Sequence, residues 1–150
     1  MSKLEPKVTP RIGLLPTGLQ IYWEQYPRLR ERGLAMYDQL VNGLSEFGEV
    51  FSPGLVDNDE RAEEAAKYLK AQDVDILLIF PFGYTTGAMI TPTIRALDVP
   101  IRLINGHVDS SYDYKTADTE DYLYHEGPCC IPEYSGTLVA QGKKFQVITG

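Results

Sequence analysis

The sequence has little of what would place the chain in a membrane, outside the cell or on a nucleic acid. No apolar run among its 150 residues approaches the roughly 20 that a membrane-spanning helix needs. The first ten residues, MSKLEPKVTP, lack the apolar segment of a secretory signal, which predicts a cytoplasmic protein. Basic residues are outnumbered by acidic ones, 14 to 21. The resulting net charge of -7 disfavours nucleic acid as a partner, because phosphate binding needs a basic surface.

Cysteine is equally scarce, which limits redox and metal chemistry. Cys129 and Cys130 are adjacent, and adjacent cysteines rarely bridge each other. Two thiols alone make a poor metal site, so we expect reduced, packed thiols and no metal-ligating residue. His125 and several carboxylates fall between residues 106 and 127, where irregular spacing predicts a solvated polar loop rather than a metal cluster. These carboxylates are Asp109, Asp113, Asp118, Glu120 and Asp121.

Hydrophobic periodicity predicts alternating strands and helices in a single domain that spans residues 1–150. The chain is 43% hydrophobic and long enough to bury a core, with residues 1–10 as a loose arm. Strands are predicted at 11–16, 49–53, 74–81, 99–105 and 143–150. Helices are predicted at 28–47, 57–72, 85–98 and 129–142.

This alternation is typical of an α/β fold with a parallel sheet. The run VDILLIFP at 74–81 is apolar without alternation, which predicts a central strand covered on both faces. Five strands joined by right-handed crossovers favour a flavodoxin-like (Rossmann-like) three-layer sandwich with strand order 2-1-3-4-5. A fifth strand normally needs a following helix. The sequence to Gly150 encodes none, so we expect another chain or segment to cover that strand.

Ligands of such sheets bind beyond the carboxyl ends of the strands, and these ends exclude several familiar sites. The turn PTGLQIYW after the first strand has one glycine, so it is not a G-x-G-x-x-G dinucleotide loop. The sequence has no Gly-Lys-Ser/Thr step of a P-loop, and PFG after the third strand lacks the acid of a phospho-receiver domain. Few Ser, Thr and Gly donors follow the first strand, which disfavours a flavin phosphate.

The remaining side chains at these ends mix neutral hydrogen-bonding groups with flat apolar rings. Such a mixture suits a polyol, because CH faces stack on rings while hydroxyls pair with amides and hydroxyls. The alternative interpretation is that the aromatic residues pack beneath loops or at a subunit contact. The set comprises Gln20, Tyr22, Trp23, Phe82, Tyr84, Thr85, Thr86, Asn105, His107 and Asp109.

Several stretches taken in order resemble the N-terminal domain of the L-arabinose and L-fucose isomerase family. They are RIGLLPTGLQIYWEQYPRLRER, GLVDNDERAEEAAKYLKAQDVDILLIFPFGYTTGAMITP, VPIRLIN and CCIPEYSGTLVAQGKKFQVITG. The resemblance implies an aldose–ketose isomerase in which a divalent cation, usually manganese (Mn2+), holds the sugar oxygens. Two glutamates then move a proton between adjacent carbons through an enediol. The family carries these groups in later domains, so the resemblance implies no catalytic residue and no cofactor in this chain.

The resemblance also implies that this domain lends residues to the sugar site of a neighbouring subunit. His107 stands where arabinose isomerases tend to carry glutamine, which leaves the sugar open. Self-association or contact with the remaining isomerase domains is expected. The family chain is several times longer, which predicts an excised domain, a fragment or a reconstructed ancestral unit. By position, the sugar contacts are Leu19, Gln20, Ile21, Tyr22, Phe82, Tyr84 and His107.

Two further functions stay open at this stage. The chain could be a non-catalytic sugar-binding or regulatory module that kept the fold without the enzyme, or a flavin-binding domain of flavodoxin type. Glutamates and histidines encoded downstream of Gly150 would favour the isomerase over the module, and a yellow purified protein would favour the flavin.

Overall fold

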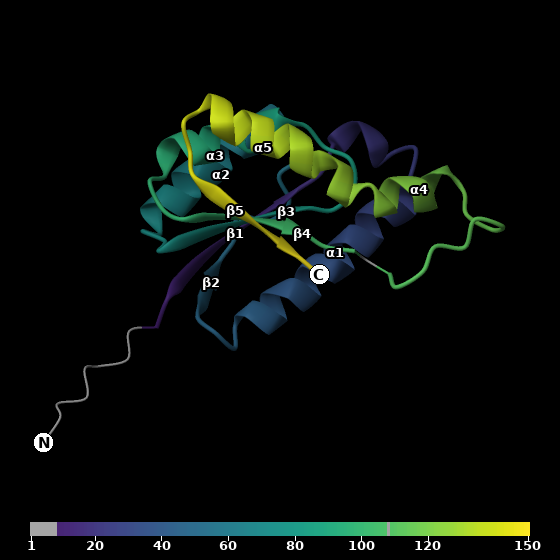
Figure 1. The fold of residues 1–150 in the computed structure, drawn as a ribbon, viewed down its shortest axis with the longest axis horizontal. Coiled ribbons are helices and arrows are strands. Elements are labelled where there is room, and N and C mark those ends of the chain that lie inside the picture. The colour runs from purple at the N-terminus through teal and green to yellow at the C-terminus, as the bar shows by residue number, and fades with distance from the viewer. Residues whose placement is uncertain (1–8, 108) are drawn as a thin grey trace, which may run out of the picture.

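The computed structural model describes residues 9–107 and 109–150, which form one parallel sheet with helices on both faces (Figure 1). Most of the arm predicted at residues 1–10 therefore lies outside the described residues. The strand order is β2-β1-β3-β4-β5, which confirms the predicted flavodoxin-like topology with β3 at the centre. The strands are β1 (Arg11–Thr17), β2 (Glu49–Phe51), β3 (Ile76–Pro81), β4 (Ile101–Asn105) and β5 (Phe145–Thr149).

The helices divide unequally between the two faces of the sheet (Figure 1). One face carries α2, α3 and α5, and the other carries α1. The short helix α4 and the 3-10 turn η1 lie at the end of the sheet where the strands finish. The helices are α1 (Pro27–Leu44), α2 (Asp59–Ala71), α3 (Thr91–Ala96), α4 (Thr119–His125) and α5 (Cys130–Ala140). The 3-10 turns are η1 (Gln20–Tyr22), η2 (Gly87–Met89) and η3 (Gly127–Cys129).

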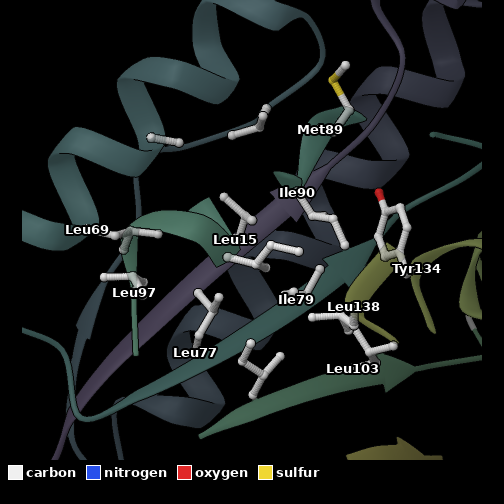
Figure 2. Packing of buried hydrophobic residues seen from close by; sticks show 14 of the residues in the cluster. Leu15, Leu69, Leu77, Ile79, Met89, Ile90, Leu97, Leu103, Tyr134 and Leu138 are labelled. Carbon is white, nitrogen blue, oxygen red and sulfur yellow. The ribbon is translucent and has the colours of Figure 1, made fainter. Parts of the chain in front are cut away.

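The two cores follow from the alternation of side chains along the central strands. Leu14 pairs with Leu78 and faces α1, whereas Leu15 pairs with Ile79 and faces the three-helix layer. The larger core packs aliphatic side chains of β3 and β4 against α2, α3 and α5 (Figure 2). The ring of Tyr134 on α5 lies among these side chains (Figure 2).

The last strand is the least covered part of the sheet. Phe145 packs against the larger core, but Val147 and Ile148, which point to opposite faces, are 43% and 50% exposed. Its inner edge pairs with β4, and no strand of the described residues pairs with its outer edge. Coverage of β5 by another chain or segment stays a prediction.

Three predicted elements are corrected by the structure. The first helix ends at Leu44, and Phe47, which its period placed inward, is 73% exposed on the following turn. The third predicted helix is divided into η2 and α3, and Pro92 stands in the first turn of α3, where the helix starts afresh. The loop predicted at 106–127 contains α4, which starts with a capping box between Asp118 and Asp121.

Candidate functional site

The loops that follow the strands gather beyond the carboxyl ends of the strands, where the 3-10 turn η1 and α4 lie (Figure 1). At this end of the sheet, the loop after β1 is hydrogen-bonded to the loop after β2. Backbone hydrogen bonds run from Gly18 N to Val56 O (3.0 Å) and from Gln20 N to Asp57 O (2.9 Å). The side chain of Asn58 donates to Gln20 Oε1 at 3.0 Å. The loop therefore has a fixed conformation rather than a free one.

The single tryptophan anchors this loop from beneath. Trp23 Nε1 donates to Asp57 Oδ2 at 2.6 Å, and its ring stacks on Phe82 at 6.0 Å between centroids. A Cβ at Gly18 would lie 2.8 Å from the indole, and a Cβ at Gly33 would lie 2.1 Å from the Phe82 ring. The one glycine of the PTGLQ turn is thus required by the close approach of Trp23.

Phe82 supports the loop and does not offer a face to a ligand. It is 1% exposed and lies between Trp23 and α1. Its predicted role as a sugar contact does not fit this position. The physical reason is that Gly33 leaves room on α1 for a buried ring, which the strand-end position of Phe82 does not reveal.

The other predicted contacts reach the surface to different degrees. Gln20 and His107 are exposed, Ile21 is 66% exposed and Tyr84 is 36% exposed. Leu19 and Tyr22 are half-buried in the same loop. A hollow of about 390 Å3 opens beside this loop, lined by Gln20, Ile21, Trp23, Glu24 and Gln25.

Tyr22 lies in the loop after β1, and Tyr84 lies in the loop after β3. Burial raises the pKa of Tyr22, and the neighbouring Tyr84 and Tyr26 phenols raise it further. The rings of Tyr22 and Tyr26 lie 6.1 Å apart. His107 lies at the end of β4, where its backbone N–H donates to Gly150 O at 2.8 Å. Tyr22, Tyr84 and His107 thus follow β1, β3 and β4 and lie at the same end of the sheet.

A buried hydrogen-bonded group lies under these loops and was not predicted. Tyr134 Oη bonds to Thr17 Oγ1 at 2.8 Å and approaches Thr85 Oγ1 at 3.4 Å, while Thr85 Oγ1 donates to Gly18 O at 2.8 Å. Burial raises the pKa of Tyr134, which keeps the phenol protonated as a donor. The group links α5 to the ends of β1 and β3. The sequence signal is weak, because Tyr134 shows only as an inward position on its helix.

The two cysteines lie beside the same loops and are not activated. Thr85 N donates to Cys130 Sγ at 3.2 Å, and burial raises the pKa of this thiol to about 11. Cys129 is exposed at the surface, and partial desolvation with a hydrogen bond to Glu126 raises its pKa to about 12. The expected packed thiol is confirmed for Cys130, whereas Cys129 is exposed. Neither thiol is a nucleophile at neutral pH.

A side chain of helix α4 caps the N-terminus of α1. Glu120, 6% exposed, accepts hydrogen bonds from the Leu29 backbone N–H and from Arg28 Nε, both at 2.6 Å. Arg28 also pairs with Asp118 at 2.6 Å. The N-cap residue, Tyr26, makes no side-chain capping bond. A carboxylate of the chain itself therefore occupies a helix end that would otherwise attract a phosphate.

A second set of contacts fixes the segment 109–125 on α1. Arg32 pairs with Asp121 at 2.7 Å and its guanidinium lies 3.7 Å from the centre of the Tyr124 ring. His125 Nε2 lies 3.4 Å from Asp109 Oδ2. The expectation of a solvated loop is thus wrong for Glu120, which is buried, and His125 is packed at the end of α4 instead. Four of the five carboxylates take part in helix caps or ion pairs, and Asp113 accepts hydrogen bonds from Lys115 N and Thr116 Oγ1.

Metal ligation and membrane insertion find no support in the described ranges. Within residues 9–107 and 109–150, no three His, Cys, Asp or Glu side chains gather as a metal would require. No helix in the same ranges combines the length and apolarity needed to cross a bilayer.

Comparison with known proteins adds no family assignment. The sequence matches no protein-family model, and a search of curated proteins returned no match.

Proposed function

We propose that this chain is the N-terminal, substrate-contacting and oligomer-forming domain of a cytoplasmic aldose–ketose isomerase of the L-arabinose/L-fucose type. In this proposal the chain supplies neutral side chains to a sugar site completed by a neighbouring subunit. The catalytic glutamates and the Mn2+ ion belong to other parts of the enzyme. The chain itself performs no chemistry.

The observation that carries the proposal is the rigid presentation of the loop after β1. Gln20 and Ile21 are exposed on a turn whose backbone is bonded to the β2–α2 loop, and Tyr84 is exposed on the loop after the neighbouring strand β3. Asn58 donates to Gln20 Oε1, which orients the amide of Gln20 and leaves Nε2 as the donor on its other side. A preformed loop with an aliphatic face, a phenol and an amide donor fits a neutral sugar.

The alternatives are weaker on the same geometry. A flavin of flavodoxin type would place its phosphate near the first helix N-terminus, which Glu120 fills with negative charge. A non-catalytic sugar-binding module would use the same loop, so it shares the sugar contacts and differs in lacking the later domains. The open faces of β5 support contact with a second copy or with those domains.

Titration of the 15N-labelled chain with L-fucose and L-arabinose tests the sugar contact. We expect weak, saturable shifts confined to the loop after β1 and to Tyr84. Ile21→Asp is expected to abolish them, whereas Val139→Asp, an equally exposed position on α5, is expected to leave them unchanged. Shifts spread over the whole surface, or saturation with flavin mononucleotide instead, would reject the proposal.

A further inference from the structure

Residues 109–125, called the α4 arm below, carry a second hollow, which the proposed sugar contacts do not use. Its volume is about 480 Å3. Three of its six lining residues are tyrosines from two separate segments of the arm, one before α4 and one on it. The lining consists of Tyr112, Tyr114, Ala117, Asp118, Thr119 and Tyr122.

Two of the three tyrosine rings are exposed, and the third, Tyr112, is half-buried between aromatic neighbours. Tyr114 is 85% exposed and Tyr122 is 55% exposed. Tyr112 meets Tyr114 edge to face at 4.8 Å between centroids, and it meets His125 edge to face at 4.7 Å. Large aromatic faces left open on a surface mark contact sites more often than isolated apolar residues do.

The surroundings of the hollow are acidic. Residues 109–126 contain six Asp and Glu against one Lys or Arg, Lys115, and the acids remain in excess after Arg28 and Arg32 of α1 pair with Asp118, Glu120, Asp109 and Asp121. The pKa of Tyr112 is raised by burial first and then by Asp121, Tyr114 and Asp118. None of the lining residues, which all fall in the described range, is basic. An electron-rich ring face in a negative field attracts a cation.

A sugar fits this hollow less well than it fits the loop after β1. The carboxylate of Asp118 is committed, because Oδ1 accepts from Asp121 N at 2.9 Å and Oδ2 accepts from Arg28 Nη2 at 2.6 Å. The lining has no amide side chain, unlike the loop after β1, and its other polar side chains are the Thr119 hydroxyl and three phenols.

The α4 arm already binds one of the chain's own arginines through an aromatic ring and a carboxylate. The Arg32 guanidinium lies over the Tyr124 ring and pairs with the Asp121 carboxylate. Arginine is suited to such a position because its planar group stacks on an aromatic face while its N–H groups point outward to acids. The neighbouring hollow also combines tyrosine faces with an acid, and that acid, Asp118, pairs with Arg28, which stands outside the lining.

We propose that the hollow formed by Tyr112, Tyr114 and Tyr122 is a docking site for an arginine-bearing segment of a partner protein. The guanidinium lies flat on the exposed ring faces, and the acidic arm favours its charge. This interaction goes beyond the proposed sugar contact and uses different residues.

The test uses the full chain labelled with 3-fluorotyrosine, in which each ring gives its own fluorine signal. The probe is the peptide acetyl-Gly-Arg-Gly-Arg-Gly-amide, compared with the same peptide carrying citrulline, which is similar in shape and uncharged. We expect saturable shifts of the Tyr114 and Tyr122 signals with the arginine peptide. Citrulline is expected to weaken binding about threefold to tenfold.

Two variants separate a binding role from a structural one. Tyr114→Ala is expected to weaken binding of the arginine peptide about threefold to tenfold, whereas Tyr114→Phe keeps the ring face and is expected to retain it. Tyr68→Ala, at a 38% exposed tyrosine on α2, is the control and is expected to change nothing. Because Tyr114 is 85% exposed, its alanine variant is expected to keep the wild-type circular dichroism spectrum.

Three outcomes would overturn the proposal. One is equal binding of the arginine and citrulline peptides, and another is the absence of saturable shifts at millimolar peptide. The third is displacement of the arginine peptide by L-fucose or L-arabinose, which would assign the hollow to the sugar. Neither of the first two results bears on the loop after β1, because its response to sugar is read from separate signals.

Discussion

The Glu120 carboxylate accepts the Leu29 backbone N–H at 2.6 Å, across 91 positions of sequence. Leu29 is the third residue of α1, so Glu120 performs from α4 the capping role that the side chain of Tyr26 does not. The same carboxylate binds Arg28 and is 6% exposed. One buried acid thus sets both the start of α1 and the position of α4.

Removal of this cap is expected to destabilise the whole fold. Glu120→Ala leaves the Leu29 N–H without its partner and Arg28 with Asp118 alone, and we expect a loss of about 1–3 kcal/mol in the free energy of unfolding. Glu120→Gln keeps one acceptor and is expected to lose less. Urea denaturation provides the measurement. Glu63→Gln, an exposed acid on α2, is the control, and an equal loss there would contradict the interpretation.

The capping box of α4 predicts a loss of stability in acid. The Asp118 backbone N–H, and then Arg32, hold the pKa of Asp121 below its usual range. Since the folded pKa is lower than the unfolded value of about 3.9, this contribution is present above that value and is lost as pH falls through the folded pKa.

Asp121→Asn is therefore expected to weaken the fold at neutral pH and to flatten its decline between about pH 5 and pH 2. Denaturant unfolding across this range gives the measurement. Asp98→Asn removes an exposed carboxyl and controls for the change in net charge. A variant with the same acid sensitivity as the wild type would show that another group is responsible.

The contact between Gly33 and Phe82 predicts an overpacking variant with an optical signal. The methyl group of Gly33→Ala would lie 2.1 Å from the Phe82 ring, which itself stacks on Trp23. We expect a loss of about 1–3 kcal/mol and a change in the fluorescence of Trp23, the single tryptophan.

Gly43→Ala is the matched control on the same helix. A Cβ there meets nothing within 4 Å, so the change is expected to be neutral or to stabilise α1 by up to about 1 kcal/mol. The double variant Gly33→Ala with Phe82→Leu is expected to recover part of the loss. If Gly33→Ala were as stable as Gly43→Ala, the ring would not be tightly held.

The open fifth strand predicts self-association. Val147 and Ile148 are exposed on opposite faces, and burying such side chains gains roughly 1.5–3 kcal/mol each. We expect a concentration-dependent oligomer by sedimentation, weakened by Val147→Ser with Ile148→Ser. Phe145 is a poorer probe, because it packs against the core. A strictly monomeric chain, or an oligomer that responds equally to Val139→Ser, would refute the prediction.

The proposed division of labour predicts that the chain alone does not isomerise sugars. We expect no ketose from L-arabinose or L-fucose, with or without added manganese, because the proposal places both catalytic glutamates elsewhere. The measurement is a colorimetric ketose assay on the purified chain. Clear turnover that scales with protein concentration would sink the claim.

The parts of the fold that could be predicted from the sequence are those with local hydrophobic signals. The apolar run from Ile76 to Phe80 identified the central strand, and the position of Gln20 and Ile21 after β1 placed them at the ligand edge. Helix α4 was missed because its sequence, TEDYLYH, is mostly polar and aromatic. Its burial depends on Glu120 reaching a distant helix end, which no local pattern encodes.

The same distinction holds within the candidate site. Exposure of Tyr84 follows from the topology of the sheet, but burial of Phe82 depends on a glycine 49 positions earlier on α1. The role of Tyr134 as a donor to Thr17 likewise joins residues 117 apart. Tertiary pairs of this kind decide which strand-end residues face solvent, and one sequence without its relatives does not reveal them.

The strand order has a consequence for how the chain is made. Strand β1 emerges first from the ribosome, β2 pairs with one side of it, and β3 pairs with the other. Strands β4 and β5 then extend the β3 side in turn, so no strand has to be inserted between two that are already paired. Each strand after β1 therefore has a neighbour that precedes it in the sequence, so the strands can pair in chain order.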